Sequence, residues 1–181
     1  MPINTNSTLP VSKVTEPKAK FPTSELRNEE NVSFSFKYLK PKSICCKEFN
    51  NKFFSIATCI EFISTFLEKL SHFSSFKVNE LKNARNEDST RCHLVKGKPL
   101  KLLEDILVNY LEFSPKFLNQ IESEFYELTI EKSKGRFFGF IIGNVYYIVL
   151  LDPHHLLYKI DGYYAKNDLA TFRYDFWKNS R

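Results

Sequence analysis

The sequence predicts an α+β protein in which an antiparallel β-meander packs against helices. Three observations predict this class. Apolar and polar residues alternate, as in a half-buried strand, near residue 32 and again from residue 126. Between these segments, apolar residues recur every three or four positions, as in amphipathic helices. Two apolar runs then flank Gly143-Asn144, a two-residue turn typical of β-hairpins.

The composition is that of a single packed domain with additional terminal segments. The chain has 181 residues, and 43% of them are hydrophobic, including 18 phenylalanines and nine tyrosines. These side chains supply enough apolar surface for a core without disulfides. Residues 137–151 form the longest apolar stretch, which Gly143-Asn144 interrupts and which is too short to span a membrane. We therefore expect a soluble cytoplasmic protein without membrane contact.

The four cysteines indicate reduced thiols rather than a disulfide framework, because no C-x-x-C spacing occurs. An alternative is a zinc site whose ligands are three thiols and one imidazole: Cys45, Cys46, Cys92 and His93. This set lacks the ligand spacing of known zinc motifs. We expect neither a metal nor another cofactor.

Composition divides the chain into three segments. Residues 1–30 are rich in Pro, Asn, Ser, Thr and Lys, which predicts a disordered leader. Residues 31–160 contain the periodic patterns and are expected to form the α+β domain. Residues 161–181 interleave aromatic and basic side chains, and we expect this segment to dock on the domain.

The first half of the domain is expected to contain one strand and two helices. Residues 32–39 alternate, with Val32, Phe34, Phe36 and Tyr38 on one face. Residues 51–70 have helical periodicity and predict an amphipathic helix. A short second helix is expected through Val78 and Ala84, with Ser74 or Ser75 as its cap.

The second half is expected to end in the meander. A short strand over residues 91–95 precedes a turn at Gly97 and Pro99, a helical stripe over 100–111, and a helix that starts at Ser114-Pro115. The meander strands are expected at 126–130, 136–142 and 145–151, with a turn at 132–135. The last two strands are apolar on both sides, so we expect them to be central and covered on both faces. Residues 154–158 are interpreted as a further edge strand.

Polar side chains are expected to gather where this hairpin begins and ends. Two seven-residue strands return the chain to its starting edge, so Arg136 is expected near residues 152–155. That edge brings a guanidinium, two imidazoles and a phenol together: Arg136, His154, His155 and Tyr158. RNA cleavage without a metal needs such groups, because a base and an acid must transfer protons while a cation stabilises the phosphate.

The same residues resemble a known family. The alternating segment 126–130, the Arg136-Phe-Phe-Gly opening, and the Val145-Tyr-Tyr-Ile-Val strand before His154-His155 and Tyr158 resemble the C-terminal meander of RelE/ParE-type toxins. The resemblance covers residues 125–158 and is greatest to the YoeB-like mRNA interferase branch. It implies a β-α-α-β-β-β core, here with a helical insertion. It also implies that Arg136 contacts phosphate and that His154 is the general acid or base, with His155 as the competing choice.

Basic residues near the predicted strands are candidates for RNA contacts. Residues 131–181 carry eight basic and five acidic side chains, which favours a phosphate-bearing partner. The candidate RNA-binding residues are Arg91, His93, Lys132, Lys134 and Arg173. The resulting hypothesis is a toxin-type, metal-independent endoribonuclease that acts on mRNA at the ribosome and has an antitoxin protein as partner. The alternative is a non-catalytic nucleic-acid- or protein-binding module of a plasmid, phage or defence system.

Overall fold

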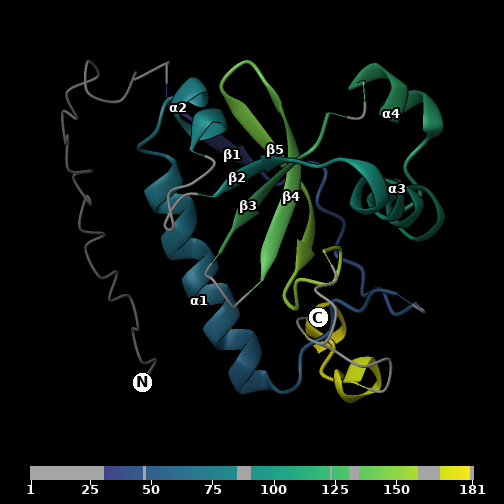
Figure 1. Ribbon diagram of the computed structural model, residues 1–181. Coiled ribbons are helices and arrows are strands. Elements are labelled where there is room, and N and C mark those ends of the chain that lie inside the picture. Colours follow the sequence, from purple (N-terminus) through teal and green to yellow (C-terminus); the bar gives the residue numbers. More distant parts are fainter. Residues whose placement is uncertain are drawn as a thin grey trace, which may run out of the picture.

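The computed structural model describes residues 31–46, 48–84, 91–122, 124–130, 135–158 and 168–179 (Figure 1). Within these ranges a five-stranded, mostly antiparallel sheet lies between two groups of helices. The predicted α+β class is therefore confirmed. The predicted leader, residues 1–30, lies outside the described residues.

The sheet has the strand order β1-β5-β4-β3-β2. Its strands are β1 (Ser33–Ser35), β2 (Cys92–Leu94), β3 (Tyr126–Thr129), β4 (Arg136–Ile142) and β5 (Val145–Asp152). The predicted meander is present, since β3, β4 and β5 pair antiparallel in succession. β2 extends it antiparallel to β3, whereas β1 pairs parallel to β5. As predicted, β4 and β5 are central strands, and Gly143-Asn144 forms the turn between them.

Two strand predictions are wrong. β1 has three residues rather than eight, because the chain turns after it and Tyr38 packs with Phe117 and Phe140 on the other side of the sheet. Residues 154–158 do not form an edge strand; the chain leaves the sheet after β5 and continues as a loop. The carboxylate of Asp152 accepts hydrogen bonds from backbone N–H groups of the following residues, which holds them in a loop.

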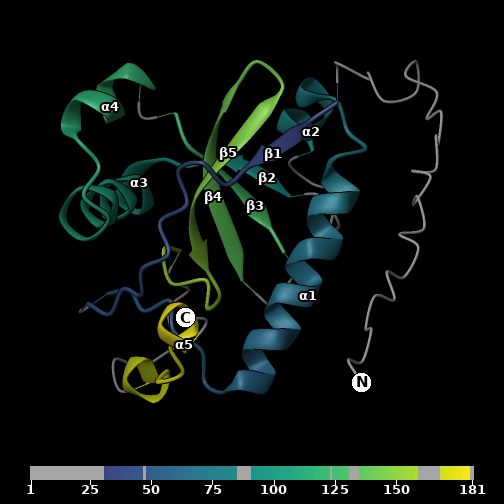
Figure 2. The same cartoon turned by 180° about the vertical axis from the view of Figure 1, so that it is seen from behind.

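One face of the sheet is covered by α1 (Ile56–Phe73) and α2 (Val78–Asn83) (Figures 1 and 2). α1 begins at Ser55, whose hydroxyl accepts from the Thr58 backbone N–H while the Thr58 hydroxyl accepts from the Ser55 N–H. The buried side of α1 packs its aromatic rings on the sheet: Phe62, Phe66 and Phe73 belong to one cluster with Phe137 and Tyr146. The predicted caps of α2 are wrong, since Ser74 instead ends α1 and Lys77 precedes α2.

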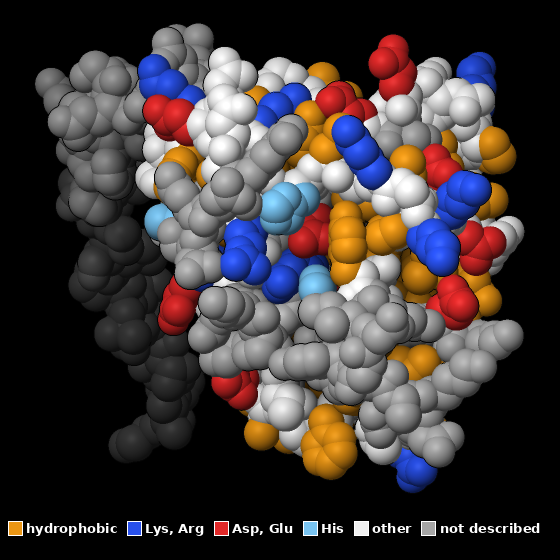
Figure 3. All heavy atoms as spheres, viewed as in Figure 1, with side chains coloured by type: hydrophobic (Ala, Val, Ile, Leu, Met, Phe, Trp, Pro, Cys, Tyr) orange, Lys and Arg blue, Asp and Glu red, His pale blue; other side chains and the backbone are white. Residues whose placement is uncertain are grey.

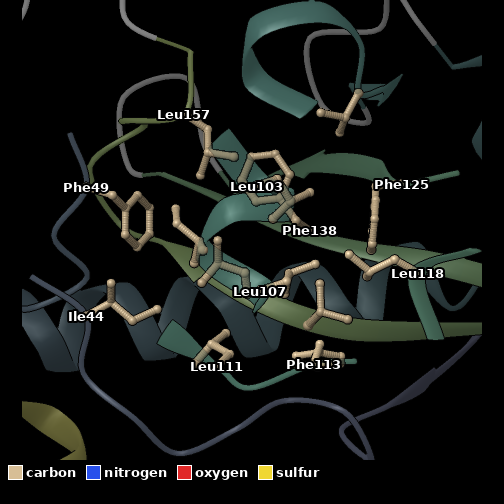
Figure 4. Packing of buried hydrophobic residues seen from close by; sticks show 14 of the residues in the cluster. Ile44, Phe49, Leu103, Leu107, Leu111, Phe113, Leu118, Phe125, Phe138 and Leu157 are labelled. Carbon is tan, nitrogen blue, oxygen red and sulfur yellow. The ribbon is translucent and has the colours of Figure 1, made fainter. Parts of the chain in front are cut away.

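The opposite face is covered by α3 (Gly97–Asp105), a π-helical turn (Ile106–Tyr110) and α4 (Pro115–Gln120). Gly97 starts α3 rather than a separate turn, and Pro99 lies in its first helical turn, where a missing N–H removes no helical hydrogen bond. Ser114 caps α4 as predicted. Figure 4 shows Leu103 and Leu107 packed with Phe138 of β4 in the cluster on this face.

A β-bulge interrupts the central hairpin. Phe138 pairs with Leu150 but Gly139 pairs with Ile148, so Val149 is the extra residue. A Cβ atom at Gly139 would collide with the Tyr147 carbonyl and the Tyr146 ring. The Tyr146 hydroxyl donates a 2.7 Å hydrogen bond to the Tyr126 carbonyl on β3. The absence of a side chain at residue 139 therefore lets a buried tyrosine cross β4.

The C-terminal segment contacts the rest of the fold through a 3₁₀ turn (Asp168–Thr171) and α5 (Phe176–Asn179). Tyr174 and Phe53 exchange two backbone hydrogen bonds of 2.9 Å. All four cysteines are free thiols. No helix in the described part of the chain has the length and apolar character needed to cross a membrane.

Candidate active site at one end of the sheet

The strand register places polar side chains on one face of the sheet, beside the cluster that α3 and α4 cover. Thr129 pairs with Arg136, and Arg136 pairs with Asp152 on the next strand. Glu127 lies two residues before Thr129 and so points to the same face. His93 on β2 is opposite Glu127. Five polar residues from four strands therefore adjoin one another on a sheet face that is otherwise apolar.

An ion pair between Glu127 and Arg136 forms the centre of this group. The two residues are only 4% and 5% exposed, and Arg136 Nε lies 3.3 Å from Glu127 Oε1. Arg136 Nη1 donates to the Gly135 carbonyl at 2.8 Å. Glu127 Oε2 and Thr129 Oγ1 are buried and have no hydrogen-bond partner among the described residues. Buried polar atoms are nearly always hydrogen-bonded, so these two oxygens mark the group as a candidate site.

Burial determines the protonation state of Glu127. It raises the pKa of Glu127 to about 7, outweighing the opposing charge of Arg136, and the charge of Asp152 adds to the rise. The pKa of Arg136 is lowered by burial, although Glu127 and Asp152 oppose this. Glu127 therefore exchanges a proton near neutral pH, which is what a general base or acid must do.

Asp152 organises the loop that follows β5. Its Oδ1 accepts from the backbone N–H of His154 at 3.3 Å, and its Oδ2 accepts from that of Leu157 at 3.0 Å. Burial raises the pKa of Asp152 to about 6, against the effect of these hydrogen bonds. Within this loop His155 has φ 56°, a left-handed conformation uncommon for residues other than glycine. The hydrogen bonds of Asp152 thus define the course of the backbone that carries His155.

His155 and Tyr158 adjoin the ion pair. Their rings stack with centroids 5.9 Å apart. Burial and the charge of Arg136 lower the pKa of His155 to about 4, while burial and the charge of Glu127 raise the pKa of Tyr158. Histidine, basic and acidic side chains gather near the middle of the surface in Figure 3, beside an apolar patch.

His154 is placed differently from His155. Its ring stacks on Phe172 at a centroid distance of 3.6 Å, and its Nε2 lies 2.6 Å from the Lys52 carbonyl oxygen, to which it donates. Burial lowers its pKa. His154 therefore joins the C-terminal segment to the segment before α1, and His155 is the histidine beside Arg136.

The predicted RNA-binding residues are spread over three parts of the chain. Arg91 is close enough for its charge to lower the pKa of Arg136, and His93 faces Glu127. Arg173 is exposed in the C-terminal segment, where its Nε donates to the Ala170 carbonyl. Lys132 and Lys134 lie outside the described residues.

Sequence reasoning missed Glu127 and Asp152 as members of the site. A usable signal existed: β4 and β5 were expected to be covered on both faces, and a strand that adjoins such a covered hairpin has its polar positions buried as well. Glu127 lies at such a position, and an acidic residue there is rare unless it is paired. Asp152 was expected near Arg136 but was not counted among the candidate site residues.

The described residues contain no group of three His, Cys, Asp or Glu side chains that would hold a metal ion. The alternative zinc ligands are not gathered in one place. Cys92 is buried in the cluster under α1, whereas Cys45 is exposed on the segment that precedes α1.

Comparison with known proteins places the chain in a family. A family model described as uncharacterised protein UU032 matches residues 34–180, a range that includes the candidate site and both groups of helices. No curated protein and no solved structure matches the chain. Because the match covers most of the sequence, the chain belongs to the UU032 family.

Proposed function

We propose that the protein is an endoribonuclease whose proton-transfer site consists of Glu127, Arg136, His155 and Tyr158. One observation carries this proposal: a buried carboxylate with a pKa of about 7 contacts a buried guanidinium, and an imidazole and a phenol lie beside them. Buried, mutually perturbed ionisable groups of this kind concentrate at active sites.

These side chains match the demands of RNA transesterification. Glu127 accepts the proton of the ribose 2′-hydroxyl, whose oxygen attacks the adjacent phosphorus. Arg136 compensates the charge that builds on the phosphate oxygens. The bond from phosphorus to the 5′-oxygen breaks, and that oxygen receives a proton from His155 or Tyr158. The products are a 2′,3′-cyclic phosphate and a 5′-hydroxyl, and no step requires an oxidant, a reductant or a second substrate.

His155 is the better donor once phosphate is present. In the free protein burial, together with the charge of Arg136, lowers the pKa of His155 and so suppresses its protonation. A bound phosphate contributes negative charge beside the imidazole and raises its pKa towards neutrality. Tyr158 stays protonated near neutral pH because its pKa is raised, so its hydroxyl donates a hydrogen bond to the same phosphate.

The arrangement of elements also supports the proposal. β1, α1, α2, β3, β4 and β5 follow one another in the order implied by the resemblance to RelE/ParE-type toxins, with β2, α3 and α4 as the insertion. Arg136 opens β4, and the histidine pair follows β5. Action on mRNA at the ribosome and control by an antitoxin belong to the same proposal.

Induced expression in bacteria tests this function. We expect the wild-type chain to arrest growth and to leave mRNA fragments with 2′,3′-cyclic phosphate ends. His155→Asn removes the imidazole while keeping a residue that tolerates the left-handed conformation, and Glu127→Gln removes the base. Both variants should abolish cleavage. His72→Ala, at an exposed position on α1, is the matched control and should remain active.

Intact mRNA in cells and in purified reactions, with and without ribosomes, would overturn the nuclease proposal. Retention of RNA on the purified protein without cleavage would instead favour the alternative of a non-catalytic binding module. Circular dichroism of each variant shows whether a loss of cleavage reflects a loss of folding.

A further inference from the structure

A hollow in the surface lies away from the proton-transfer site. It has a volume of about 560 Å³, is partly open to solvent, and is lined by the segment before α1, the π-helical turn and the segment around α5. Figure 2 shows the segment that follows β1 running beside α5. None of its lining residues belongs to the group around Glu127, so it requires its own explanation.

The walls of this cavity are held by specific contacts. Ser43 Oγ donates a hydrogen bond to Asp175 Oδ1, which also accepts from the Lys178 backbone N–H at 3.2 Å. The backbone pairing of Phe53 with Tyr174 fixes the adjacent chain. The cavity is therefore a preformed feature that joins two distant parts of the sequence, as ligand sites commonly are.

The lining of the cavity is positively charged. It contains three lysines and one carboxylate: Lys42, Lys52, Lys178 and Asp175. Asp175 is 7% exposed, and its Oδ2 lies 3.7 Å from Lys52 Nζ. Within the described part of the chain this oxygen has no hydrogen-bond partner, so its charge attracts the Lys52 ammonium group to the cavity wall. Lys42 pairs with Glu112 at the exposed rim. The excess of lysines favours an anionic ligand.

Two aromatic rings complete the lining. Tyr110 ends the π-helical turn and Trp177 belongs to α5, so the two rings come from different elements of the lining. Both side chains are half-buried and belong to the lining of the cavity. Aromatic faces bind the bases of nucleic acids by stacking, whereas lysines bind phosphate.

We propose that this cavity binds a nucleotide, with the base against Tyr110 or Trp177 and the phosphate near the lysines. The volume is suited to a ligand of that size. The nucleotide has two sources, a free mononucleotide or one unit of a single-stranded RNA. The inference does not depend on the proposed nuclease, although the Lys52 carbonyl contacts His154 and so links the cavity wall to the loop of that site.

Fluorescence gives a site-specific test, because Trp177 is the only tryptophan of the chain. Titration of the full-length protein with adenosine, cytidine, guanosine and uridine monophosphates should change this emission to saturation. Inorganic phosphate and the unphosphorylated nucleosides should bind at least about tenfold more weakly, since each makes only part of the contacts. Saturation by a six-nucleotide RNA at lower concentration than by any monophosphate identifies RNA as the source.

Two variants with a matched control separate the contributions. Tyr110→Leu keeps apolar volume but removes a stacking face, and should weaken nucleotide binding about tenfold without changing phosphate binding. Lys178→Ala should weaken binding of nucleotide and phosphate alike by about three- to fivefold. Lys98→Ala, an exposed lysine of α3 outside the cavity, should change neither.

The proposal fails if no monophosphate and no RNA gives a saturable change in Trp177 emission up to millimolar concentration. It also fails if the two cavity variants bind as tightly as the Lys98→Ala control. Glu127→Gln leaves the cavity unaltered, so this variant should still bind nucleotide even though it should not cleave RNA. Its nucleotide binding therefore tests the cavity proposal separately from the nuclease proposal.

Discussion

At the scale of single residues, the ion pair of Glu127 and Arg136 combines two opposing effects. Burial disfavours both charges, while their contact favours both. For Glu127 burial is the larger effect, and its pKa rises from 4.5 to about 7. A carboxyl whose pKa is raised on folding contributes stability below its unfolded pKa and loses it as pH rises through the folded value.

This linkage predicts the pH dependence of stability. Wild-type protein should lose the contribution of Glu127 between pH 5 and pH 8, whereas Glu127→Gln has no such contribution to lose. The unfolding free energy of the variant relative to wild type should therefore rise by about 2 kcal/mol over that interval. The lowered pKa of His155 acts in the opposite direction below about pH 6.5, but both proteins retain this residue, so its effect cancels in the difference.

Urea denaturation at pH 5 and pH 8 measures this difference. Parallel stability curves for the two proteins would show that Glu127 ionises as an ordinary carboxyl. Asn79→Asp adds an exposed carboxyl on α2 and should leave the pH dependence nearly unchanged.

At the scale of elements, the hairpin of β4 and β5 depends on its bulge at Gly139. The Tyr146 ring crosses the strand there to reach the Tyr126 carbonyl, and no space remains for a methyl group. A buried backbone and a fully buried ring form the obstruction, so neither is free to move aside.

Gly139→Ala should therefore lower the unfolding free energy by about 3 kcal/mol, the upper end of the usual cost of overpacking. Gly143→Asn at the hairpin turn is the comparison, because asparagine tolerates the positive φ and space is open there. It should cost less than about 1 kcal/mol. Chemical denaturation of both variants checks the ranking, and equal stabilities would show that the hairpin adapts around residue 139.

Strand and helix positions were predictable to different degrees. The meander, its turn and the cap at Ser114 follow from local patterns and were predicted. The bulge at Gly139 was not predicted, since it depends on where the Tyr146 ring lies in space. The length of β1 and the placement of Tyr38 also depend on tertiary contacts, with Phe140 among them, which alternation alone does not encode.

The candidate site was also predictable only in part, because local patterns indicate some of its geometry and tertiary contacts determine the rest. The geometry of a hairpin indicates that Arg136 and the end of β5 lie close together, and the register pairs Arg136 with Asp152. It does not indicate which of two adjacent histidines turns towards the arginine. That choice depends on the hydrogen bonds of Asp152 and on the ring of Phe172, which belongs to a distant segment.

At the scale of the whole molecule, Phe172 joins the C-terminal segment to the loop of the candidate site. It is 8% exposed, it stacks on His154, and its carbonyl accepts a hydrogen bond from the buried Asn50 side chain. The His154 ring in turn donates a hydrogen bond to the carbonyl oxygen of Lys52. One ring therefore connects the end of the chain, the segment before α1 and the residues after β5.

Phe172→Ala should lower the unfolding free energy by about 3 kcal/mol, as expected for removing a buried ring. It should also reduce RNA cleavage in the proposed nuclease, because the loop that carries His155 loses its support. Arg173→Ala changes the next, exposed residue and should leave the melting temperature nearly unchanged. Thermal unfolding of the two variants and their cleavage rates test both statements; matching melting temperatures would contradict the connecting role.

The parallel pairing of β1 with β5 has a consequence for synthesis of the chain. The hydrogen bonds between residues 33–35 and β5 form only after residues 145–147 have been synthesised. The aromatic side of α1 likewise emerges from the ribosome before Phe137, the ring that it packs against, has been translated. At roughly 5–20 residues per second, that side of the helix stays uncovered for several seconds. The nascent chain is therefore at its most aggregation-prone while the insertion is being made, and a chaperone that binds aromatic surface would act in this interval.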